Sequence, residues 1–534
     1  MVDEVLHLKS RCGGGKSIGT ITGLYDFLLG SQDETVVFAS KKLDLSAQNH
    51  ESFIQKQDVA ALAEGQQFIP IPHIRIDIET VSGSTVKARL HECLDSGFRG
   101  VIFVSHAVLT SVDPKKMRHV RLIVDEVPSN LVKHIDVKYK EKGGGNSWEN
   151  YIVTNPCNHV NYEIVSINPN ANLEEISQRA RDIRSEKDTN DNKKVGVLLE
   201  FLLDGNESVY TTVISSGNKK NEPDRVYQAI DWRGLRNITS NVRRFSILAA
   251  QLKDTLVGFV LNNVIAVGIE DAVIPGNVPL ETQHKNKARI YPMLSTGRWS
   301  TYLKDRIARN ALCLNGQPVP SDETVIQYAQ TIAKKIIQGR ESLLILNKKD
   351  GIHPDLDIAN VESISSGSHG LNIYRNFDHA IYLSSNRYNT YEEKALRIFA
   401  KDYGVFDDSI VEAVITERCH ELCYQNIART SIRNDVVKAG VEHVFVVPDM
   451  AHAKYLLQWF DGGAVIDETY SHTRITARSG SKREKDLNKI IQVRRDYQAN
   501  MGRIEDICKV YSLNKRTYYD HAKRFEKELM ALGL

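Results

Sequence analysis

The feature that most constrains the fold is an alternation between short apolar runs and segments long enough to form helices. Five runs rich in β-branched and aromatic residues occur in the first half of the chain: EVLHL, TVVFAS, GVIFVSH, VRLIVDE and FSILAAQL. Four more follow in the second half: ARIYPML, SLLILN, HAIYLSS and HVFVVP. Such runs, separated by helix-length segments, are typical of parallel strands buried under helices on both faces. The sequence therefore predicts an α/β protein with two blocks of parallel sheet.

The length of the chain implies more than one hydrophobic core, because 534 residues exceed what a single core supports. We expect three domains, which cover residues 1–275, 276–475 and 478–534. The last is expected to be small and all-helical, and it holds 14 Lys and Arg against 8 Asp and Glu. We interpret the polar segments rich in glycine or asparagine as surface loops or insertions: 141–150, 185–194 and 215–224.

Composition narrows the class of protein without identifying a partner. The formal net charge is +2, so any surface that binds a polyanion must be local. The chain has no run of about 18 apolar residues, and its first residues lack the pattern of a signal peptide. The seven cysteines are scattered, and the one close pair, Cys419 and Cys423, has no second pair to complete a zinc site. We expect reduced thiols, no membrane contact and a cytoplasmic location (the host cytoplasm if the chain is viral).

A glycine-rich stretch, SRCGGGKS at residues 10–17, follows the first apolar run. Glycines let the backbone approach a phosphate closely, a lysine ammonium can reach the terminal phosphates, and a hydroxyl can hold Mg²⁺. The residues that would do this are Gly13, Gly14, Gly15, Lys16 and Ser17. The pattern departs from a P-loop at Ser10, where glycine is usual. A tight loop beside a surface lysine is the alternative, so a second motif has to decide.

Two acidic residues end another apolar run, in the segment VRLIVDEVP. Asp125 would bind Mg²⁺ through water, and Glu126 would polarise the water that attacks the γ-phosphate. A solvated acidic pair at a strand end is the alternative. Two further predicted strands lie between the glycine loop and this pair, a spacing that suits one doubly wound domain. Together the two motifs predict a nucleoside-triphosphate hydrolase.

The second half offers positive groups in the segment CYQNIARTSIR. Gln425, Arg429 and Arg433 recur at every fourth residue, which predicts that they lie on one face of a helix. A solvated helical face would show the same spacing. In a chain that also carries a glycine loop, we interpret the arginines as fingers that stabilise charge on the γ-phosphate from a second lobe.

In order along the chain, these motifs resemble those of superfamily 2 helicases, in which two RecA-like lobes enclose ATP. The matching segments are SRCGGGKS (motif I), VVFASKKLDLSAQ (Ia), VIFVSHAVL (Ib), VDEVP (II), SILAAQLKDT (III), SLLILNKK (IV), SSGSHGLNIYRNFDHAIYLSS (V) and QNIARTSIR (VI). The resemblance covers roughly residues 1–460 and is strongest to viral and phage replication helicases, including the origin-binding type. It implies two tandem RecA-like domains, followed here by the small helical domain.

The resemblance also implies ATP and Mg²⁺ as ligands and a track for a nucleic-acid strand across both lobes. Motif V would contribute Gly370 to the nucleotide site and would also contact the strand. The residues expected along the track are Ser40, Lys41, Ser105, His106, Asn347, Lys348, Ser368 and His369. Each of them could instead cap the end of a strand or helix. The two histidines are expected to form hydrogen bonds, because no partner lies at metal-ligand spacing.

Three motifs depart from the family pattern. Motif II reads D-E-V-P, and motif III is one residue wider than the usual S-A-T. In motif VI, Arg433 follows Gln425 by eight residues, where the family has seven. This difference leaves open which arginine is the finger, because Arg429 matches the first arginine position and Arg433 is displaced from the second.

The C-terminal stretch GRIEDICKVYSLNKRTYYDHAKRF, residues 502–525, predicts two helices around a short turn. The apolar residues of the first helix and the turn would face inward: Ile504, Ile507, Cys508, Tyr511 and Leu513. This is the shape of a helix-turn-helix, whose second helix enters the major groove. The residues expected to face DNA are Lys515, Arg516, Tyr519 and Arg524. A basic helical hairpin that packs on the motor is the alternative.

The leading hypothesis is an ATP-dependent motor that translocates on and unwinds nucleic acid in phage or viral replication, with DNA favoured over RNA. A single strand would occupy the track and a duplex the tail, and replication proteins are candidate partners. A second class stays open: a DNA-binding or origin-recognition protein that uses nucleotide as a switch and does not unwind. Continuous hydrolysis stimulated by a strand would favour the motor.

Overall fold

The computed structural model describes residues 2–62, 68–140, 148–159, 161–185, 193–205, 208–214, 224–273, 281–353, 360–367, 373–388, 390–434, 440–475, 489–491, 493–494, 497–498, 503–510, 513–526 and 529. The chain forms two compact units. The main unit comprises Met1–Asp305 and Ile326–Ser471, and the second unit comprises Arg306–Val325 and His472–Leu534. The three-domain division expected from the sequence stays a prediction. Among the described residues, no helix is long and apolar enough to span a membrane.

The first sheet of the main unit has seven strands in the order β12-β1-β11-β5-β2-β4-β3, and all neighbouring pairs are parallel. Successive side chains of β2 alternate between the faces, as strand geometry requires. Val36 and Phe38 pack with α1 and α2, whereas Val37 and Ala39 pack with α3 and α7. The strands are β1 (Glu4–Lys9), β2 (Thr35–Ser40), β3 (His73–Arg75), β4 (Gly100–Ser105), β5 (Val120–Asp125), β11 (Arg244–Ala249) and β12 (Gly268–Asp271). The helices are α1 (Lys16–Leu29), α2 (Leu43–Leu62), α3 (Val86–Asp95) and α7 (Arg233–Asn241).

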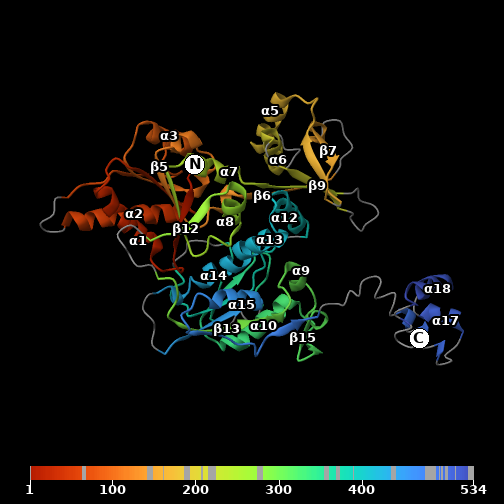
Figure 1. The fold of residues 1–534 in the computed structure, drawn as a ribbon. Helices are drawn as coiled ribbons and strands as arrows, with labels where there is room; N and C mark the ends of the chain where they lie inside the picture. Colours follow the sequence, from red (N-terminus) through yellow and green to blue (C-terminus); the bar gives the residue numbers. More distant parts are fainter. Residues whose placement is uncertain are drawn as a thin grey trace. The chain divides into compact units, whose positions relative to one another are not determined.

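The second sheet of the main unit has six parallel strands in the order β18-β17-β19-β20-β13-β21. One face is covered by α14 and α15, whose apolar side chains share a core with the strands (Figure 1). The strands are β13 (Lys287–Pro292), β17 (Ser342–Leu346), β18 (Val361–Ser365), β19 (His379–Tyr382), β20 (Glu442–Val447) and β21 (Ala464–Ile466). The helices are α10 (Val325–Ile337), α14 (Leu422–Ile427) and α15 (Met450–Leu457). The predicted α/β class with two parallel sheets is therefore confirmed, and the arrangement is that of tandem RecA-like lobes.

An antiparallel sheet is inserted between β5 and β11, which the sequence patterns did not predict. Its five strands have the order β6-β10-β9-β8-β7, and α5 and α6 pack on one face (Figure 1). The elements are β6 (Lys133–Lys140), β7 (Ile152–Pro156), β8 (Glu163–Ile167), β9 (Val209–Ile214), β10 (Asp224–Asp231), α5 (Leu173–Arg184) and α6 (Lys193–Asp204). The expected loop segments lie between these elements, and parts of them (141–147, 186–192 and 215–223) lie outside the described residues. The insertion is thus a folded subdomain with its own core.

The two lobes share one hydrophobic core at α12 (Thr390–Asp402) and α13 (Asp407–Ile415). Leu396, Phe399 and Ile410 are buried in the same cluster as side chains of the first sheet. Polar contacts join the same elements, since His134 of β6 lies 3.2 Å from the Glu392 carboxylate of α12. That histidine and Arg418 lower the pKa of Glu392 to about 2 despite its burial. The second lobe is therefore attached to the first over a wide apolar contact.

The second unit contains a small antiparallel sheet and the C-terminal helices. Its strands are β15 (Leu312–Leu314), β16 (Gln317–Pro318) and β22 (His472–Arg474), and its helices include α17 (Ile504–Val510) and α18 (Lys515–Arg524). Ile507 and Cys508 are buried with Tyr518 and Ala522 in a core of their own, and Ile504 and Leu513 pack against it. The two helices and their inward residues are as expected, and Tyr511 lies outside the described residues.

Candidate nucleotide site between the two parallel sheets

The carboxyl ends of β1, β11, β5, β2 and β4 meet at one edge of the first sheet. The register pairs Asp125 with Leu248 on one side and with Ser40 on the other, and Ser40 pairs with Ser105. In open parallel sheets, ligands bind at this edge. The residues that follow these strands are therefore brought together by topology, although they are far apart in sequence.

The glycine loop joins the end of β1 to the start of α1. Gly13 and Gly15 have φ angles of 80° and 75°, in the left-handed region that favours glycine. Gly15 is the N-cap residue of α1, so Lys16 stands at the first helical position. The amide groups of a helix start and its dipole attract anions. The loop therefore has the conformation and polarity expected of a phosphate-binding turn.

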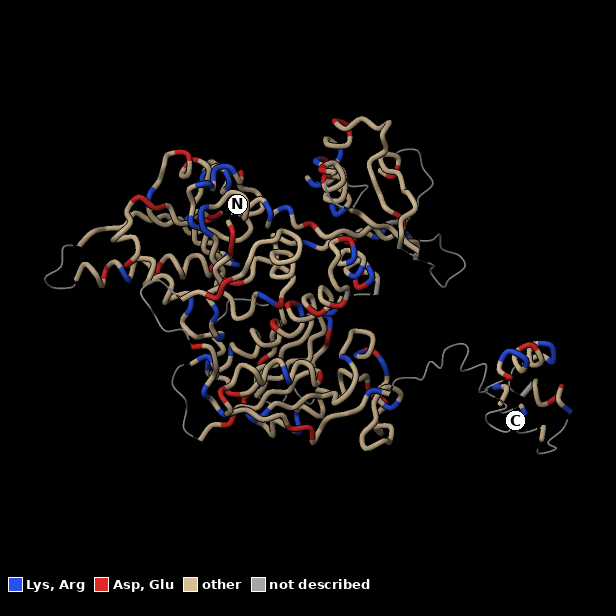
Figure 2. The backbone as a smooth tube through the Cα atoms, in the orientation of Figure 1, with Lys and Arg blue, Asp and Glu red and all other residues tan. Residues whose placement is uncertain are grey.

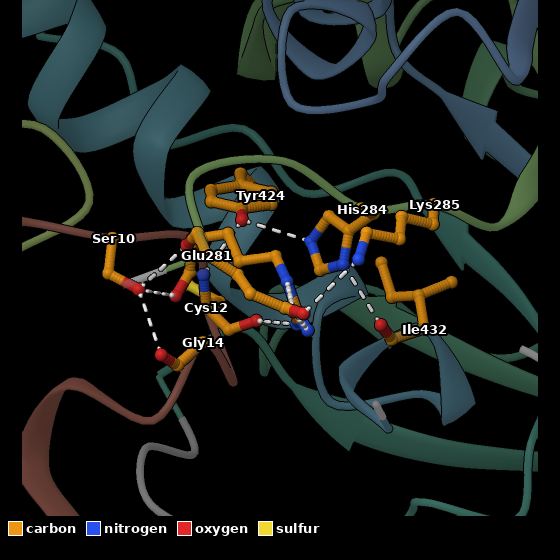
Figure 3. Close-up of polar contacts among 9 residues, drawn as sticks. Ser10, Cys12, Gly14, Glu281, His284, Lys285, Tyr424 and Ile432 are labelled. Atoms are coloured by element: carbon orange, nitrogen blue, oxygen red, sulfur yellow. Dashed lines mark hydrogen bonds and ion pairs between the residues drawn. The ribbon is translucent and has the colours of Figure 1, made fainter. Parts of the chain in front are cut away.

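Ser10, the residue that departs from the P-loop pattern, has a structural role in this fold. Its hydroxyl donates to the carbonyl of Glu281 at 2.9 Å, in the segment that connects the two sheets, and lies 3.2 Å from the Gly14 carbonyl (Figure 3). A Cβ at Gly14 would lie 2.2 Å from the Ser10 hydroxyl and 2.7 Å from the Glu281 carbonyl oxygen. The serine thus fastens the glycine loop to the interlobe connection, which a glycine could not do.

The predicted metal ligands are in contact with each other. The Ser17 hydroxyl lies 3.0 and 3.1 Å from the two carboxylate oxygens of Asp125. Burial raises the pKa of Asp125, while the nearby Lys16 lowers it. Among the described residues, Lys16 has no hydrogen bond or ion pair, so its ammonium is available to a ligand. Hydroxyl, carboxylate and ammonium therefore converge at the start of α1.

Glu126 has a backbone conformation that is rare for its residue type. Its φ angle is 74°, and such left-handed non-glycine residues cluster at functional sites. Its carboxylate forms an ion pair with Lys41 at 3.0 Å. Lys41, which the family resemblance assigns to the strand track, therefore lies beside the carboxylate assigned to water activation.

Other residues assigned to the track also lie close to these carboxylates. Ser40 is buried and accepts a hydrogen bond from Asn49 at 3.0 Å, and Asn49 also reaches Asp125 at 3.4 Å. His106 is 4% exposed, burial lowers its pKa to about 4, and the charges of Glu126 and Lys41 also act on it. Ser105 is half-buried and is the N-cap residue of α4 (His106–Leu109). Their contact with a strand stays a prediction.

Motif IV and motif V residues lie in the second lobe. The Asn347 side chain accepts from the Lys304 ammonium at 2.7 Å and donates to the Ser385 carbonyl at 3.2 Å. It therefore joins the loops after β17 and β19, whereas Lys348 is exposed to solvent. Gly367 follows β18, and Ser368, His369 and Gly370 lie outside the described residues.

The expected helical face of motif VI is wrong. The helix α14 ends at Ile427, and only Gln425 of the three polar residues lies on it. The Thr430 hydroxyl donates to the Ile427 carbonyl at 2.8 Å, which satisfies the helix end, and residues Ser431–Arg433 form a short 3-10 helix. The four-residue spacing therefore does not produce a common helical face.

Both arginines nevertheless lie at the candidate site. Arg429 is 5% exposed, and its Nη1 has no hydrogen-bond partner among the described residues. Burial lowers the pKa of Arg429, and the nearby Glu126 raises it. Arg433 packs directly on the glycine loop, since a Cβ at Gly13 would lie 2.3 Å from its Cγ. A buried guanidinium nitrogen without a protein partner is costly unless a ligand pairs with it.

A polar network that the motifs did not reveal joins the glycine loop to the second lobe (Figure 3). The buried Arg11 guanidinium pairs with the Glu281 carboxylate, with Nε at 2.9 Å. The Cys12 amide donates to the Tyr424 hydroxyl at 2.8 Å, and His284 Nε2 lies 3.0 Å from the same hydroxyl. Tyr424 also stacks on Trp459, with ring centroids 4.6 Å apart. These residues hold the loop against α14.

No protein-family model and no curated protein sequence matches the chain. Among solved structures, the chain is similar to the helicase MrfA bound to DNA and AMPPNP, with 9% identity, a TM-score of 0.35, and coverage of 87% of this chain and 50% of that one. It is similar to Mss116p bound to single-stranded RNA and AMP-PNP, with 10% identity, a TM-score of 0.33, and coverage of 100% and 86%. It is also similar to a Dbp5 variant from S. cerevisiae bound to RNA and ADP BeF₃, with 8% identity, a TM-score of 0.34, and coverage of 87% of this chain and 85% of that one.

The chain thus spans half the length of MrfA. All three similar structures are described as helicases or as bound to nucleic acid and nucleotide. The identities are 10% or less and the TM-scores 0.33–0.35, so the similarity to these helicases is loose, and the fold assignment rests on strand order and register.

Proposed function

We propose that this protein is an ATP-dependent nucleic-acid translocase that unwinds DNA. The observation that carries the proposal is the buried Arg429 of the second lobe. Its Nη1 has no hydrogen-bond partner in the described part of the chain, and it lies within electrostatic range of Glu126 of the first lobe. A guanidinium in that state fits an anion that forms between the lobes. Because the glycine loop and Lys16 lie nearby, a nucleoside triphosphate is the anion that fits best.

The residues present fit a complex of ATP with Mg²⁺. The glycine loop and Lys16 would hold the phosphates, and Ser17 and Asp125 would hold the metal through hard oxygen donors. Among the described residues, no group of three or more His, Cys, Asp or Glu side chains could hold a metal by itself. The ion would therefore share its ligands with the phosphates, whose charge it neutralises when bound.

Hydrolysis requires a base for water and positive charge at the γ-phosphate. Glu126 would accept the proton of the attacking water, and its left-handed backbone fixes the direction from which its side chain extends. Arg429 would stabilise the charge that develops on the γ-phosphoryl oxygens, with Arg433 beside the glycine loop. Because the arginines and the loop belong to different lobes, ATP would draw the lobes together, and product release would relax them.

The tail supports DNA as the partner. Exposed Lys515, Arg516, Tyr519 and Arg524 lie on α18, where Lys and Arg positions recur in Figure 2. A short basic helix that follows a turn is suited to the major groove of a duplex. The unit would dock the protein on duplex DNA, while the strand track of the lobes engages a single strand, as expected for a replication enzyme.

A nucleotide-operated DNA-binding switch is the second candidate. It is favoured by the core that the lobes share at α12 and α13, because a wide apolar contact limits their relative motion. Such a protein would bind ATP and hydrolyse it once per binding event without separating strands.

One pair of assays decides between the two. ATP hydrolysis is measured without nucleic acid and with single-stranded DNA, single-stranded RNA or duplex DNA, using Lys16→Ala as the blank. Strand displacement is then measured on forked, 3′-tailed, 5′-tailed and blunt duplexes. We expect continuous hydrolysis stimulated by single-stranded DNA and displacement from at least one tailed substrate. Hydrolysis equal to that of the Lys16→Ala protein would refute the ATPase, and continuous hydrolysis without displacement would refute unwinding.

A further inference from the structure

A buried carboxylate of the second lobe, Glu421, has not been assigned a role by any motif. It is 4% exposed, and both of its oxygens are engaged. Oε1 accepts from Gln425 Nε2 at 3.0 Å, and Oε2 accepts from the Tyr455 hydroxyl of α15 at 2.7 Å. Burial of a carboxylate is costly, so a site that retains one with two well-made hydrogen bonds has a use for it.

The surroundings of Glu421 connect it to the candidate nucleotide site. Burial raises its pKa, Lys16 lowers it, and Glu126 raises it. These two residues belong to the first lobe, at the starts of α1 and of the segment after β5. Tyr424, which lies between Glu421 and Gln425 in sequence, accepts a hydrogen bond from the Cys12 amide of the glycine loop at 2.8 Å. This segment of the second lobe therefore contacts the loop proposed to bind ATP.

The carboxylate determines which way the Gln425 amide is turned. A carboxylate is an acceptor only, so it selects the NH₂ group of the amide and leaves the carbonyl oxygen as the other end. In the described part of the chain, Gln425 Oε1 accepts no hydrogen bond. The same amide turned over would present its NH₂ group, which donates hydrogen bonds and cannot accept one from water. Glu421 thus fixes the Gln425 amide so that its carbonyl oxygen is available on α14 as a hydrogen-bond acceptor.

The π-helix that carries Glu421 also contacts the first lobe. Residues Thr416–Glu421 form a π-helix, a rare element that is frequent at functional sites. Near its start, Glu417 Oε2 accepts from the Leu256 amide at 2.9 Å, at the first residue of α8 (Leu256–Val260) in the first lobe. One end of the π-helix is thus fastened to the first lobe, and the other end holds Gln425.

We propose that Glu421 is a positioning residue that holds Gln425 so that its amide oxygen accepts a hydrogen bond from the water attacking the γ-phosphate. The inference rests on the proposed ATPase function and adds a residue to it. An amide oxygen that orients the attacking water is an established device in nucleotide hydrolysis. Tyr455 completes the arrangement by occupying the second carboxylate oxygen, which prevents Glu421 from turning toward Lys16.

The test is a double-mutant cycle on the full-length protein, read as kcat and KM for ATP at saturating single-stranded DNA. Glu421→Ala should lower kcat by about 10- to 100-fold, the cost typical of a displaced reacting group, and leave KM within about twofold. In a Gln425→Ala background the same change should have no further effect, because Glu421 acts through Gln425. The Glu421→Gln protein should retain most of the wild-type kcat, since the carbonyl oxygen of the new glutamine can still accept a hydrogen bond from Gln425.

Two controls separate positioning from folding. Glu417→Gln alters a half-buried carboxyl on the same π-helix, and its effect on kcat should be multiplicative with that of Gln425→Ala. Tyr455→Phe removes one hydrogen bond and should lower kcat by about threefold, which supplies a second route if Glu421→Ala does not fold. The thermal midpoint of each variant is measured alongside.

The outcomes are distinct. Independent, multiplicative effects of Glu421→Ala and Gln425→Ala would overturn the proposal, as would a KM that rises in step with the fall in kcat. If wild-type hydrolysis is no faster than that of Lys16→Ala, the ATPase proposal itself fails, and that result is seen before any variant of Glu421 is made.

Discussion

The two lobes contribute to the candidate site from different kinds of backbone. In the first lobe, Asp125 ends β5, Glu126 follows it, and Lys16 begins the helix that the glycine loop joins to β1, so parallel strands place these groups at one edge of the sheet. In the second lobe, Glu421, Arg429 and Arg433 lie on a π-helix, a turn and a 3-10 helix. Regular strand ends can be located from apolar runs alone, whereas irregular backbone is positioned by tertiary contacts.

The difference also separates two chemical tasks. First-lobe groups are in mutual contact, as Ser17 with Asp125 and Lys41 with Glu126, so they form a binding surface on one body. Arg429 belongs to the second lobe and has a nitrogen that no described residue pairs with, so its contribution depends on how the lobes meet. We therefore expect first-lobe variants to affect binding or the chemical step directly, and second-lobe variants to affect turnover with affinity largely kept.

The largest effect is expected from the first-lobe base. Glu126→Gln should lower the hydrolysis rate about 10³-fold and leave ATP binding intact, because the amide cannot take a proton from water. Lys16→Ala should instead weaken binding. Single-turnover hydrolysis and nucleotide titration measure the two effects. A wild-type hydrolysis rate in the Glu126→Gln protein would show that the carboxylate pair has been misassigned.

The second largest effect is expected from the arginines of the second lobe. Arg429→Ala is expected to lower kcat about 10²-fold with a much smaller change in ATP affinity, since its contact strengthens as the γ-phosphate departs. Arg433→Ala is the matched comparison, because Arg433 packs on the loop itself and should affect affinity more. Steady-state kinetics of both variants locate the finger. Normal turnover in both would place it elsewhere.

Deletion of residues 478–534 tests whether the tail is separate from both lobes. The core of Ile507, Cys508, Tyr518 and Ala522 is formed within the second unit, so the lobes should stay folded. We expect ATPase activity at saturating single-stranded DNA to persist, and duplex affinity to fall about tenfold with a flatter salt dependence. Charge reversal at Lys515 and Arg516 should reproduce this. If truncation lowers the thermal midpoint and the ATPase together, the tail packs on the motor.

The smallest effect concerns acid stability of the network between the loop and the second lobe. Burial lowers the pKa of His284 to about 3, below the unfolded value of about 6.5. Between these values the unfolded chain binds a proton that the folded chain does not, so stability is lost as the pH falls below about 6.5. The expected slope is up to about 1.4 kcal/mol per pH unit for this residue. Urea denaturation at pH 7, 6 and 5 measures it, and His284→Gln should reduce the slope.

The sequence predicted the parts of the site that depend on strands. Asp125 and the glycine loop could be brought together in advance, because parallel strands place their carboxyl ends at one edge. The helical face of motif VI could not be predicted correctly, since the Thr430 hydroxyl and the Ile427 carbonyl end the helix between Gln425 and Arg429. Spacing alone cannot distinguish a continuous helix from one that ends.

Contacts between residues far apart in sequence could not be predicted from the motifs either. Arg11 and Glu281 are far apart in sequence, and their pairing depends on how the connection between the sheets folds back on the glycine loop. Glu281 belongs to no motif, and Arg11 lies in the motif I segment at a position to which the motif assigns no role. The antiparallel insertion was missed because its apolar residues face α5 and α6 on one side only, which gives weaker apolar runs than the fully buried parallel strands.

The shared core at α12 and α13 has a mechanical consequence. Each large apolar side chain buried there contributes about 1.5–3 kcal/mol, so prising Leu396, Phe399 and Ile410 together out of the first lobe would cost a large part of a typical folding free energy. That patch must then stay closed during any cycle and serve as a pivot. Arg433 and Gly13 are in contact outside that patch, so a rotation of the lobes about the patch would move one against the other. The stroke available to the protein would then grow with the distance between this contact and the pivot.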